Sequence, residues 1–155
     1  FYLHRNFYKE YDFAGTPFCA AIADVEKSSD NILIYGHHSN AGTMFTQIEK
    51  YEDIDFYKEH KYIKFDTLKS NRTYEVIAAF RTDVNESTYP YYEFADGNKE
   101  EFDEYINNAK SLTPYNIETT AEYGDKLISL SKCAYHTHNG RFVVVAKRIS
   151  EAMLN

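Results

Sequence analysis

The chain has no tryptophan and only two cysteines, three prolines and six glycines in 155 residues. Two cysteines cannot form the multi-bridge framework that stabilises small secreted domains, so Cys19 and Cys133 form either one bridge or two free thiols. No apolar run approaches the roughly 20 residues of a membrane-spanning helix. Internal repeats, low-complexity tracts and linkers are also lacking. The length therefore favours one domain, residues 1–155, with a substantial core.

Positive charge is in the minority, and no basic cluster stands out. The 17 Lys and Arg residues are outnumbered by 24 Asp and Glu residues, which gives a formal net charge of -7. Such a balance disfavours nucleic acid as a partner. It is compatible with a cationic partner such as an amine.

Aromatic residues are abundant, with 15 Tyr and 11 Phe, and they favour a pleated, half-buried surface. The apolar patterning predicts a mostly antiparallel barrel or rolled sheet of about six to eight short strands with peripheral helices. Strands are expected at 16–25, 32–35, 62–65, 72–81, 126–130 and 141–149, and helical segments at 1–15, 43–51, 54–59 and 98–112.

Cys133 and Arg141 are the first candidates for chemistry. Cys133 stands at the tip of one apolar run, and Arg141 stands at the foot of the next, eight residues on. If both runs are neighbouring strands, a thiol lies beside a permanent cation at the mouth of a sheet. This setting can make sulfur reactive.

A cysteine nucleophile needs a proton-transfer partner, which is usually histidine because its pKa lies near neutrality. Of the six histidines, His37 and His38 stand out because they follow the apolar segment 32–35 and Gly36, where a buried strand leaves the sheet. Strand ends are fixed by the scaffold and open to substrate. Together with Cys133 and Arg141, these histidines would suit acyl transfer through a thioester.

Other interpretations of the same residues stay open. A lone cysteine is more often structural than catalytic, and Cys19, in an apolar stretch, is expected to be a small core residue. Cys133, His136 and His138, with His37 or His38, could form a tetrahedral zinc site, although the spacing matches no usual zinc finger. A third alternative is a silent surface module that binds peptide or glycan along the tyrosine-rich segment 89–92.

Two segments resemble the sortases, the cysteine transpeptidases of Gram-positive cell surfaces, and look most like class B. Residues 31–38, Asn-Ile-Leu-Ile-Tyr-Gly-His-His, with 42–45, resemble the segment around the catalytic histidine. Residues 130–135, Leu-Ser-Lys-Cys-Ala-Tyr, with Arg141, resemble the segment around the catalytic cysteine and arginine. The expected helix at 98–112 fits the long helix that class B enzymes carry before the cysteine strand.

The resemblance implies that Cys133 is the nucleophile and His37 the general acid and base, while Arg141 holds the oxyanion and the substrate. One position departs from the pattern, because Lys132 stands where the family usually has threonine. Since neighbouring side chains on a strand alternate faces, Lys132 need not face the site.

Further positions follow from the resemblance. Ser131 resembles a class B serine that helps to bind the substrate peptide, and Tyr105 and Ile106 match substrate-wall positions on the loop helix. Three histidines match no catalytic position: His38, His136 and His138.

The resemblance also carries expectations for the whole protein. The fold would be a closed β-barrel of about eight strands, with a helical stretch at the N-terminus and a helix in the loop before the cysteine strand. The substrate would be a C-terminal sorting signal of surface proteins, and the acceptor an amine of a peptidoglycan precursor or a pilin lysine. No metal or organic cofactor is required. Because the chain opens with Phe1, an anchor segment is expected to precede it and to hold the protein at the outer face of the cell membrane.

Overall fold

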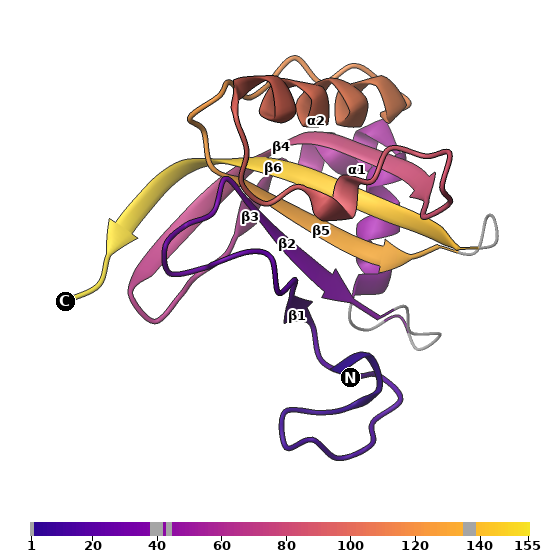
Figure 1. The fold of residues 1–155 in the computed structure, drawn as a ribbon, viewed down its shortest axis with the longest axis vertical. Helices are drawn as coiled ribbons and strands as arrows, with labels where there is room; N and C mark the ends of the chain where they lie inside the picture. Colours follow the sequence, from indigo (N-terminus) through magenta and orange to yellow (C-terminus); the bar gives the residue numbers. More distant parts are fainter. Residues whose placement is uncertain (1, 38–41, 43–44, 135–138) are drawn as a thin grey trace.

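The computed structural model describes residues 2–37, 42, 45–134 and 139–155, and its elements are arranged as in Figure 1. The strands are β1 (Phe18–Cys19), β2 (Asn31–Gly36), β3 (Tyr62–Lys64), β4 (Ser70–Asp83), β5 (Leu127–Cys133) and β6 (Gly140–Met153). The α-helices are α1 (Ile54–Glu59) and α2 (Lys99–Leu112), and the 3-10 helices are η1 (Tyr2–His4), η2 (Phe45–Glu52) and η3 (Tyr91–Glu93). No helix among these residues is both long and apolar enough to cross a membrane.

The six strands form one sheet in the order β1-β2-β5-β6-β4-β3. Strands β2 and β5 run parallel, and every other neighbouring pair is antiparallel. The edge strands β1 and β3 have only two and three residues and are not hydrogen-bonded to each other. The described residues thus form an open sheet of six strands, and closure into a barrel of about eight is not confirmed.

The strand expected at 16–25 is wrong beyond Cys19. The chain turns immediately after β1, where the amide of Ala23 donates to the carbonyl of Ala20 at 3.0 Å. The carboxylate of Asp24 then accepts hydrogen bonds from the amides of Glu26 and Lys27, both at 2.9 Å. Apolar composition favours a strand here, but these local hydrogen bonds favour a turn.

The expected N-terminal helical stretch at 1–15 is reduced to the three residues of η1, followed by turns. In Figure 1 this segment lies below β1, outside the layer of the six strands. Several of its aromatic side chains are exposed, including Phe7, Tyr8 and Tyr11.

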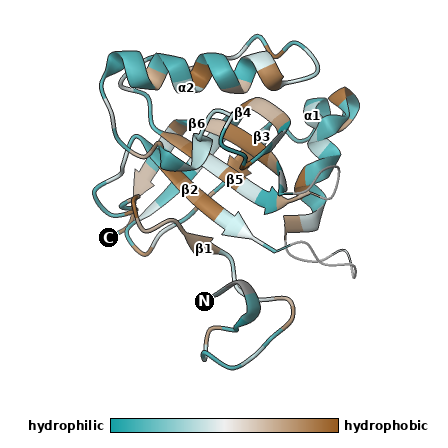
Figure 2. Ribbon diagram, turned by 45° about the vertical axis from the view of Figure 1, so that its right-hand side comes forward, coloured by the Kyte–Doolittle hydropathy of each residue, from teal (hydrophilic) through white to brown (hydrophobic). Residues whose placement is uncertain are grey.

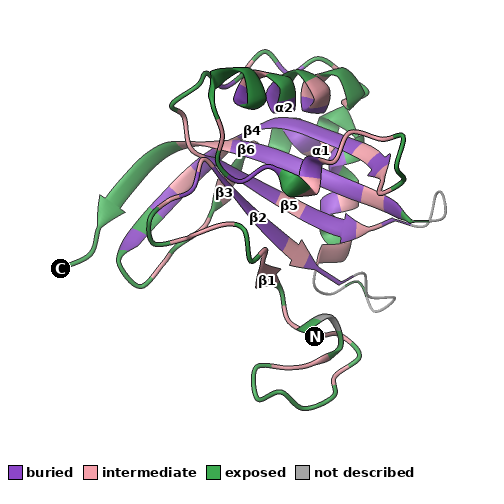
Figure 3. Cartoon of the chain, viewed as in Figure 1, coloured by how far each residue is buried: buried purple, intermediate pink, exposed green. Residues whose placement is uncertain are grey.

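Both faces of the sheet carry a hydrophobic core, and the central strands are almost entirely buried (Figure 3). One face, which α2 covers, buries Leu33, Ile77 and Val143 among others. The opposite face packs against η2 and α1. The core between this face and the two helices contains, among others, Ile32, Ile34, Ile48, Tyr51, Tyr57, Val76, Ile128, Phe142 and Val144. The apolar positions that serve both cores show as brown bands along the strands in Figure 2.

Helix α2 is confirmed where the sequence predicts it. Asn98 caps the N-terminus: its side-chain oxygen accepts a hydrogen bond from the Glu101 amide at 2.9 Å, and the Glu101 carboxylate accepts one from the Asn98 amide at 2.8 Å. This reciprocal capping box satisfies two amides that the helix itself cannot bond. The buried side of the helix is formed by Phe102, Tyr105, Ile106 and Ala109.

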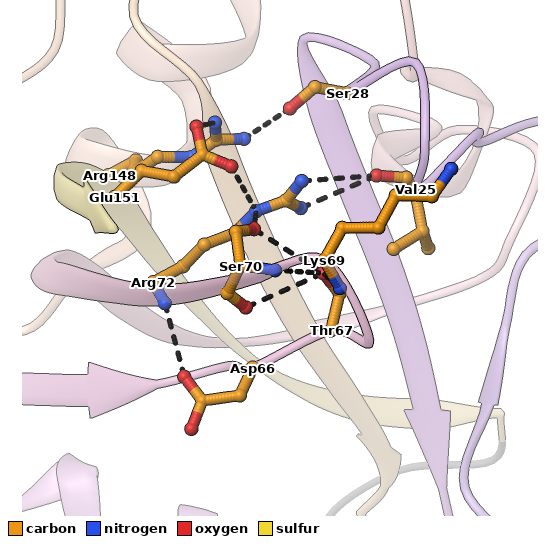
Figure 4. A network of polar contacts seen from close by, with 9 residues as sticks. All are labelled: Val25, Ser28, Asp66, Thr67, Lys69, Ser70, Arg72, Arg148 and Glu151. Atoms are coloured by element: carbon orange, nitrogen blue, oxygen red, sulfur yellow. Dashed lines mark hydrogen bonds and ion pairs between the residues drawn. The ribbon is translucent and has the colours of Figure 1, made fainter. Parts of the chain in front are cut away.

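A polar network closes the end of the sheet near the C-terminus, shown in Figure 4. Arg72, 5% exposed, donates from Nε to Glu151 at 3.0 Å, and Arg148 donates to the other carboxylate oxygen at 2.9 Å. A hydrogen bond from Ser70, followed by the contribution of Arg72, lowers the pKa of Glu151. This network ties β4 to β6.

Candidate active site

Three neighbouring strands bring the predicted site residues to one edge of the sheet. Gly36 at the end of β2 is the register partner of Lys132 on the parallel strand β5. One residue further, Cys133 is the partner of Arg141 on the antiparallel strand β6. His37 directly follows Gly36, so His37, Cys133 and Arg141 form one row across three adjacent strand ends, at the right-hand side of the sheet in Figure 1.

The side chains of this row are partly sheltered. His37 is 9% exposed, and Cys133 and Arg141 are half-buried. The rings of His4 and Phe13 meet the His37 ring edge-on, with centroid distances of 5.3 and 5.6 Å. The N-terminal segment therefore packs against the imidazole and restricts its orientation.

Ser131 and Tyr91 lie beside the row on the same face of the sheet as Cys133. Ser131 is fully buried, and its hydroxyl is 2.8 Å from the Tyr91 hydroxyl. Burial raises the pKa of Tyr91 to about 12, although the Ser131 hydrogen bond and the nearby Arg141 lower it. Tyr91 also interacts electrostatically with Cys133. Sequence reasoning did not single out Tyr91 as part of this site, and the tyrosine-rich segment 89–92 was the only signal for it.

Tyr105 and Ile106 hold core positions in this structure. Tyr105 is fully buried, and its hydroxyl lies 2.6 Å from the hydroxyl of Ser129. Ile106 is 4% exposed. Both side chains are buried between α2 and the sheet, and their expected place in a substrate wall stays a prediction.

Lys132 faces the side of the sheet away from the site, as strand alternation predicts. Its side chain is completely buried, and its Nζ lies 3.0 Å from a carboxylate oxygen of Glu49 on η2. The departure from the family pattern thus lies behind the row of site residues.

The metal interpretation falls largely outside the described residues, because His38, His136 and His138 lie there. Within the described part of the chain, no three His, Cys, Asp or Glu side chains are grouped to hold a metal ion. Cys133 and Cys19 are both free thiols. Cys19 is half-buried rather than deep in the core, and burial followed by the charge of Asp24 raises its pKa.

A cysteine, a histidine and an arginine are the groups that thiol-based acyl transfer uses as nucleophile, proton-transfer partner and oxyanion stabiliser. The Sortase domain model matches residues 14–149, and the chain belongs to the sortase family. The resemblance to class B is confirmed by relatives named Sortase B. That of Staphylococcus aureus (strain NCTC 8325 / PS 47) is 29% identical over 96% of this chain and 60% of its own length. That of Listeria monocytogenes is 28% identical over 97% of this chain and 61% of its own length.

Solved structures agree with these relatives. A Staphylococcus aureus sortase B-substrate complex superposes with a TM-score of 0.85 at 29% identity, covering 96% of this chain and 68% of that one. The structure of Clostridium perfringens sortase B gives a TM-score of 0.87 at 28% identity, and the match covers 97% of this chain and 81% of that one. The chain spans about three fifths of the length of the curated relatives, at 60% and 61%.

Proposed function

We propose that this protein is a cysteine transpeptidase that cleaves a sorting signal and joins the new carboxyl end to an amine. The observation that carries this proposal is the single row of His37, Cys133 and Arg141 at one sheet edge in a chain of the sortase family. Residues 1–155 act as one catalytic domain. Closure of their sheet into a barrel of about eight strands stays a prediction.

In the first half-reaction, the Cys133 thiolate attacks the carbonyl carbon of a threonine in the sorting peptide. The carbonyl oxygen becomes an oxyanion, which the Arg141 guanidinium stabilises. His37 then donates a proton to the departing amine as the peptide C–N bond breaks. The products are a thioester on Cys133 and the released C-terminal fragment.

In the second half-reaction, an acceptor amine attacks the thioester carbon. His37, neutral after the first step, takes the proton that the amine loses, and the C–S bond breaks to return the Cys133 thiolate. A new amide bond joins the two substrates. The acceptor is an amine of a peptidoglycan precursor or a pilin lysine, and the net negative charge of the chain is compatible with such a cation.

Ser131 and Tyr91 form the floor beside the nucleophile. Their hydroxyls are buried and bonded to each other, which steadies the strand end that carries Cys133. A role of Ser131 in binding the sorting peptide stays a prediction. A sortase B-substrate complex is among the similar structures, which supports a peptide substrate for this chain as well. We place the protein on the cell surface of a Gram-positive bacterium, as with the sortase B relatives, with an anchor at the membrane.

The test is cleavage of a panel of fluorogenic sorting-signal peptides, followed by transfer to an added amine. Cys133→Ala should abolish cleavage, and Arg141→Lys should lower kcat by about a hundredfold because a point ammonium cannot reproduce the guanidinium fork. Cys19→Ala is the matched control, since it removes the other free thiol.

Cys19→Ala should cleave at the wild-type rate. Equal cleavage by wild type and Cys133→Ala would refute the assignment of the nucleophile. Full activity of Arg141→Lys would remove Arg141 from the mechanism. Peptide binding by the wild type without any cleavage would favour the silent binding module instead.

A further inference from the structure

A chain of ion pairs lies on the face of the sheet opposite the site residues. The Lys132 ammonium, with a side chain 0% exposed, is 3.0 Å from one carboxylate oxygen of Glu49. The other oxygen of Glu49 accepts a hydrogen bond from Arg81 at 3.2 Å. Arg81 in turn binds both carboxylate oxygens of Glu52, each at 2.8 Å. Two carboxylates from η2 thus alternate with cations from β5 and β4.

The two cations, Lys132 and Arg81, lie in one row of register partners that crosses four neighbouring strands. Gly36 is the register partner of Lys132, Lys132 of Phe142, and Phe142 of Arg81. This row lies one position deeper in the sheet than the row of His37, Cys133 and Arg141, and its side chains face the other side, because neighbouring side chains on a strand alternate faces. Any element that covers it therefore packs directly behind the site.

Helix η2 is that element. Phe45, its first residue, packs so closely on Gly36 that an added Cβ would lie 2.3 Å from the Phe45 ring. One turn later, Glu49 reaches Lys132. The helix therefore touches β2 at the residue before His37 and β5 at the residue before Cys133.

An ammonium in this position requires its carboxylate partner. A charge buried without a counter-charge is strongly unfavourable, so Lys132 and Glu49 fix the position of η2 on β5 more narrowly than apolar packing alone. Threonine, the usual family residue at this position, is too short to reach Glu49 in the same way. The link is thus specific to a chain that has lysine here.

We propose that Lys132 is a positioning residue of this site. Its buried ion pair with Glu49 holds η2 against the ends of β2 and β5, and thereby fixes His37 relative to Cys133. This inference rests on the proposed transpeptidase function, because it concerns the geometry of the same proton transfer. Neither Lys132 nor Glu49 touches the substrate, so the effect falls on kcat and not on KM.

The test is a double-mutant cycle with Lys132→Met and Glu49→Gln, with Lys64→Met on an exposed position of β3 as the matched control. The rate at which Cys133 is acylated during cleavage of the sorting peptide is measured at a temperature below the unfolding temperature of every variant. Each single variant should lower kcat about tenfold with KM unchanged, because small displacements of reacting groups cost this much or more. The double variant should lose no more than a single variant, since one link is broken in all three.

Hydrogen exchange of the η2 amides provides a readout that does not depend on activity. It should be faster in both single variants and unchanged in Lys64→Met. If Lys132→Met does not fold, Glu49→Gln carries the test alone, because it breaks the same link and leaves β5 intact.

Three results would overturn the positioning role. The first is a wild-type kcat in both single variants, and the second is a change confined to KM. The third is a hundredfold loss of kcat in the double variant, equal to the product of the losses in the two single variants. Failure of the proposed function is a different result, in which wild type itself shows no acylation that depends on Cys133.

Discussion

At the scale of single residues, Gly36 has little room for a larger side chain, and the reason lies on both sides of the sheet. Its missing side chain admits the ring of Phe45 on one side, while the next residue, His37, enters the site on the other. A glycine in the interior of a strand often marks such a close approach. The sequence shows the glycine and the histidine but not the aromatic ring that explains the glycine.

Gly36→Ala should therefore destabilise the protein by about 1–3 kcal/mol through overpacking, as measured by urea unfolding. It should also lower kcat for peptide cleavage, because the displaced strand end carries His37. A second substitution, Phe45→Ala, opens space for the new methyl group and should restore part of the stability in the double variant. Additive losses in that double variant would show that the clash with Phe45 is not the cause.

Residue patterns alone were sufficient to select Cys133, Arg141 and the pair His37 and His38, because strand ends can be read from apolar runs. The choice of His37 over His38 came from the resemblance to the sortases. Residue patterns could not identify Tyr91, whose contact with Ser131 joins segments 40 positions apart. They also could not provide Glu49 as the partner of Lys132. Such contacts depend on which elements pack together, and that information is not local to either residue.

At the scale of elements, α2 is the one that the sequence describes best. Its apolar positions recur at helical spacing, and Asn98 and Glu101 mark its start. The segment 16–25 shows the opposite outcome, because a turn begins at Ala20 and the Asp24 carboxylate then accepts hydrogen bonds from the amides of Glu26 and Lys27, although the apolar composition favours a strand. The 3-10 geometry of η2 was likewise not predicted, since its apolar spacing also fits an α-helix.

Replacing the cap of α2 tests how much local sequence stabilises this element. Asn98→Ala should lower the free energy of unfolding by about 1 kcal/mol, because the amide of Glu101 loses its hydrogen-bond acceptor. Asn98→Asp keeps an acceptor oxygen and is the matched control. Urea unfolding followed by circular dichroism measures both, and equal stability of Asn98→Ala and wild type would contradict the capping role.

At the scale of the whole molecule, buried tyrosines set a limit on stability in alkali. Burial raises the pKa of Tyr51, Tyr89, Tyr91 and Tyr115 to about 12 in the folded chain. In the unfolded chain these phenols lose their protons near pH 10. Between these two values the folded state binds more protons than the unfolded state, so stability falls as the pH rises.

We expect the free energy of unfolding to decline steeply from about pH 10 upward, with phenolate absorbance rising in step with loss of structure. Tyr91→Phe should reduce the slope of this decline, because one phenol that titrates between the two states is removed. Tyr62→Phe, at an exposed position, is the matched control. A wild-type slope in Tyr91→Phe would show that its phenol titrates alike in both states.

The parallel pairing of β2 with β5 has a further consequence for the timing of activity. It joins distant parts of the chain: Asn31 and Ser129, which are hydrogen-bonded across it, are 98 positions apart. Contacts at such separation slow folding, because the long intervening loop must be closed before they can form. Until then Cys133 has neither His37 nor a completed sheet beside it and reacts as an ordinary thiol. On the proposed function, a newly made or refolding chain therefore lacks a transpeptidase site until β2 has paired with β5.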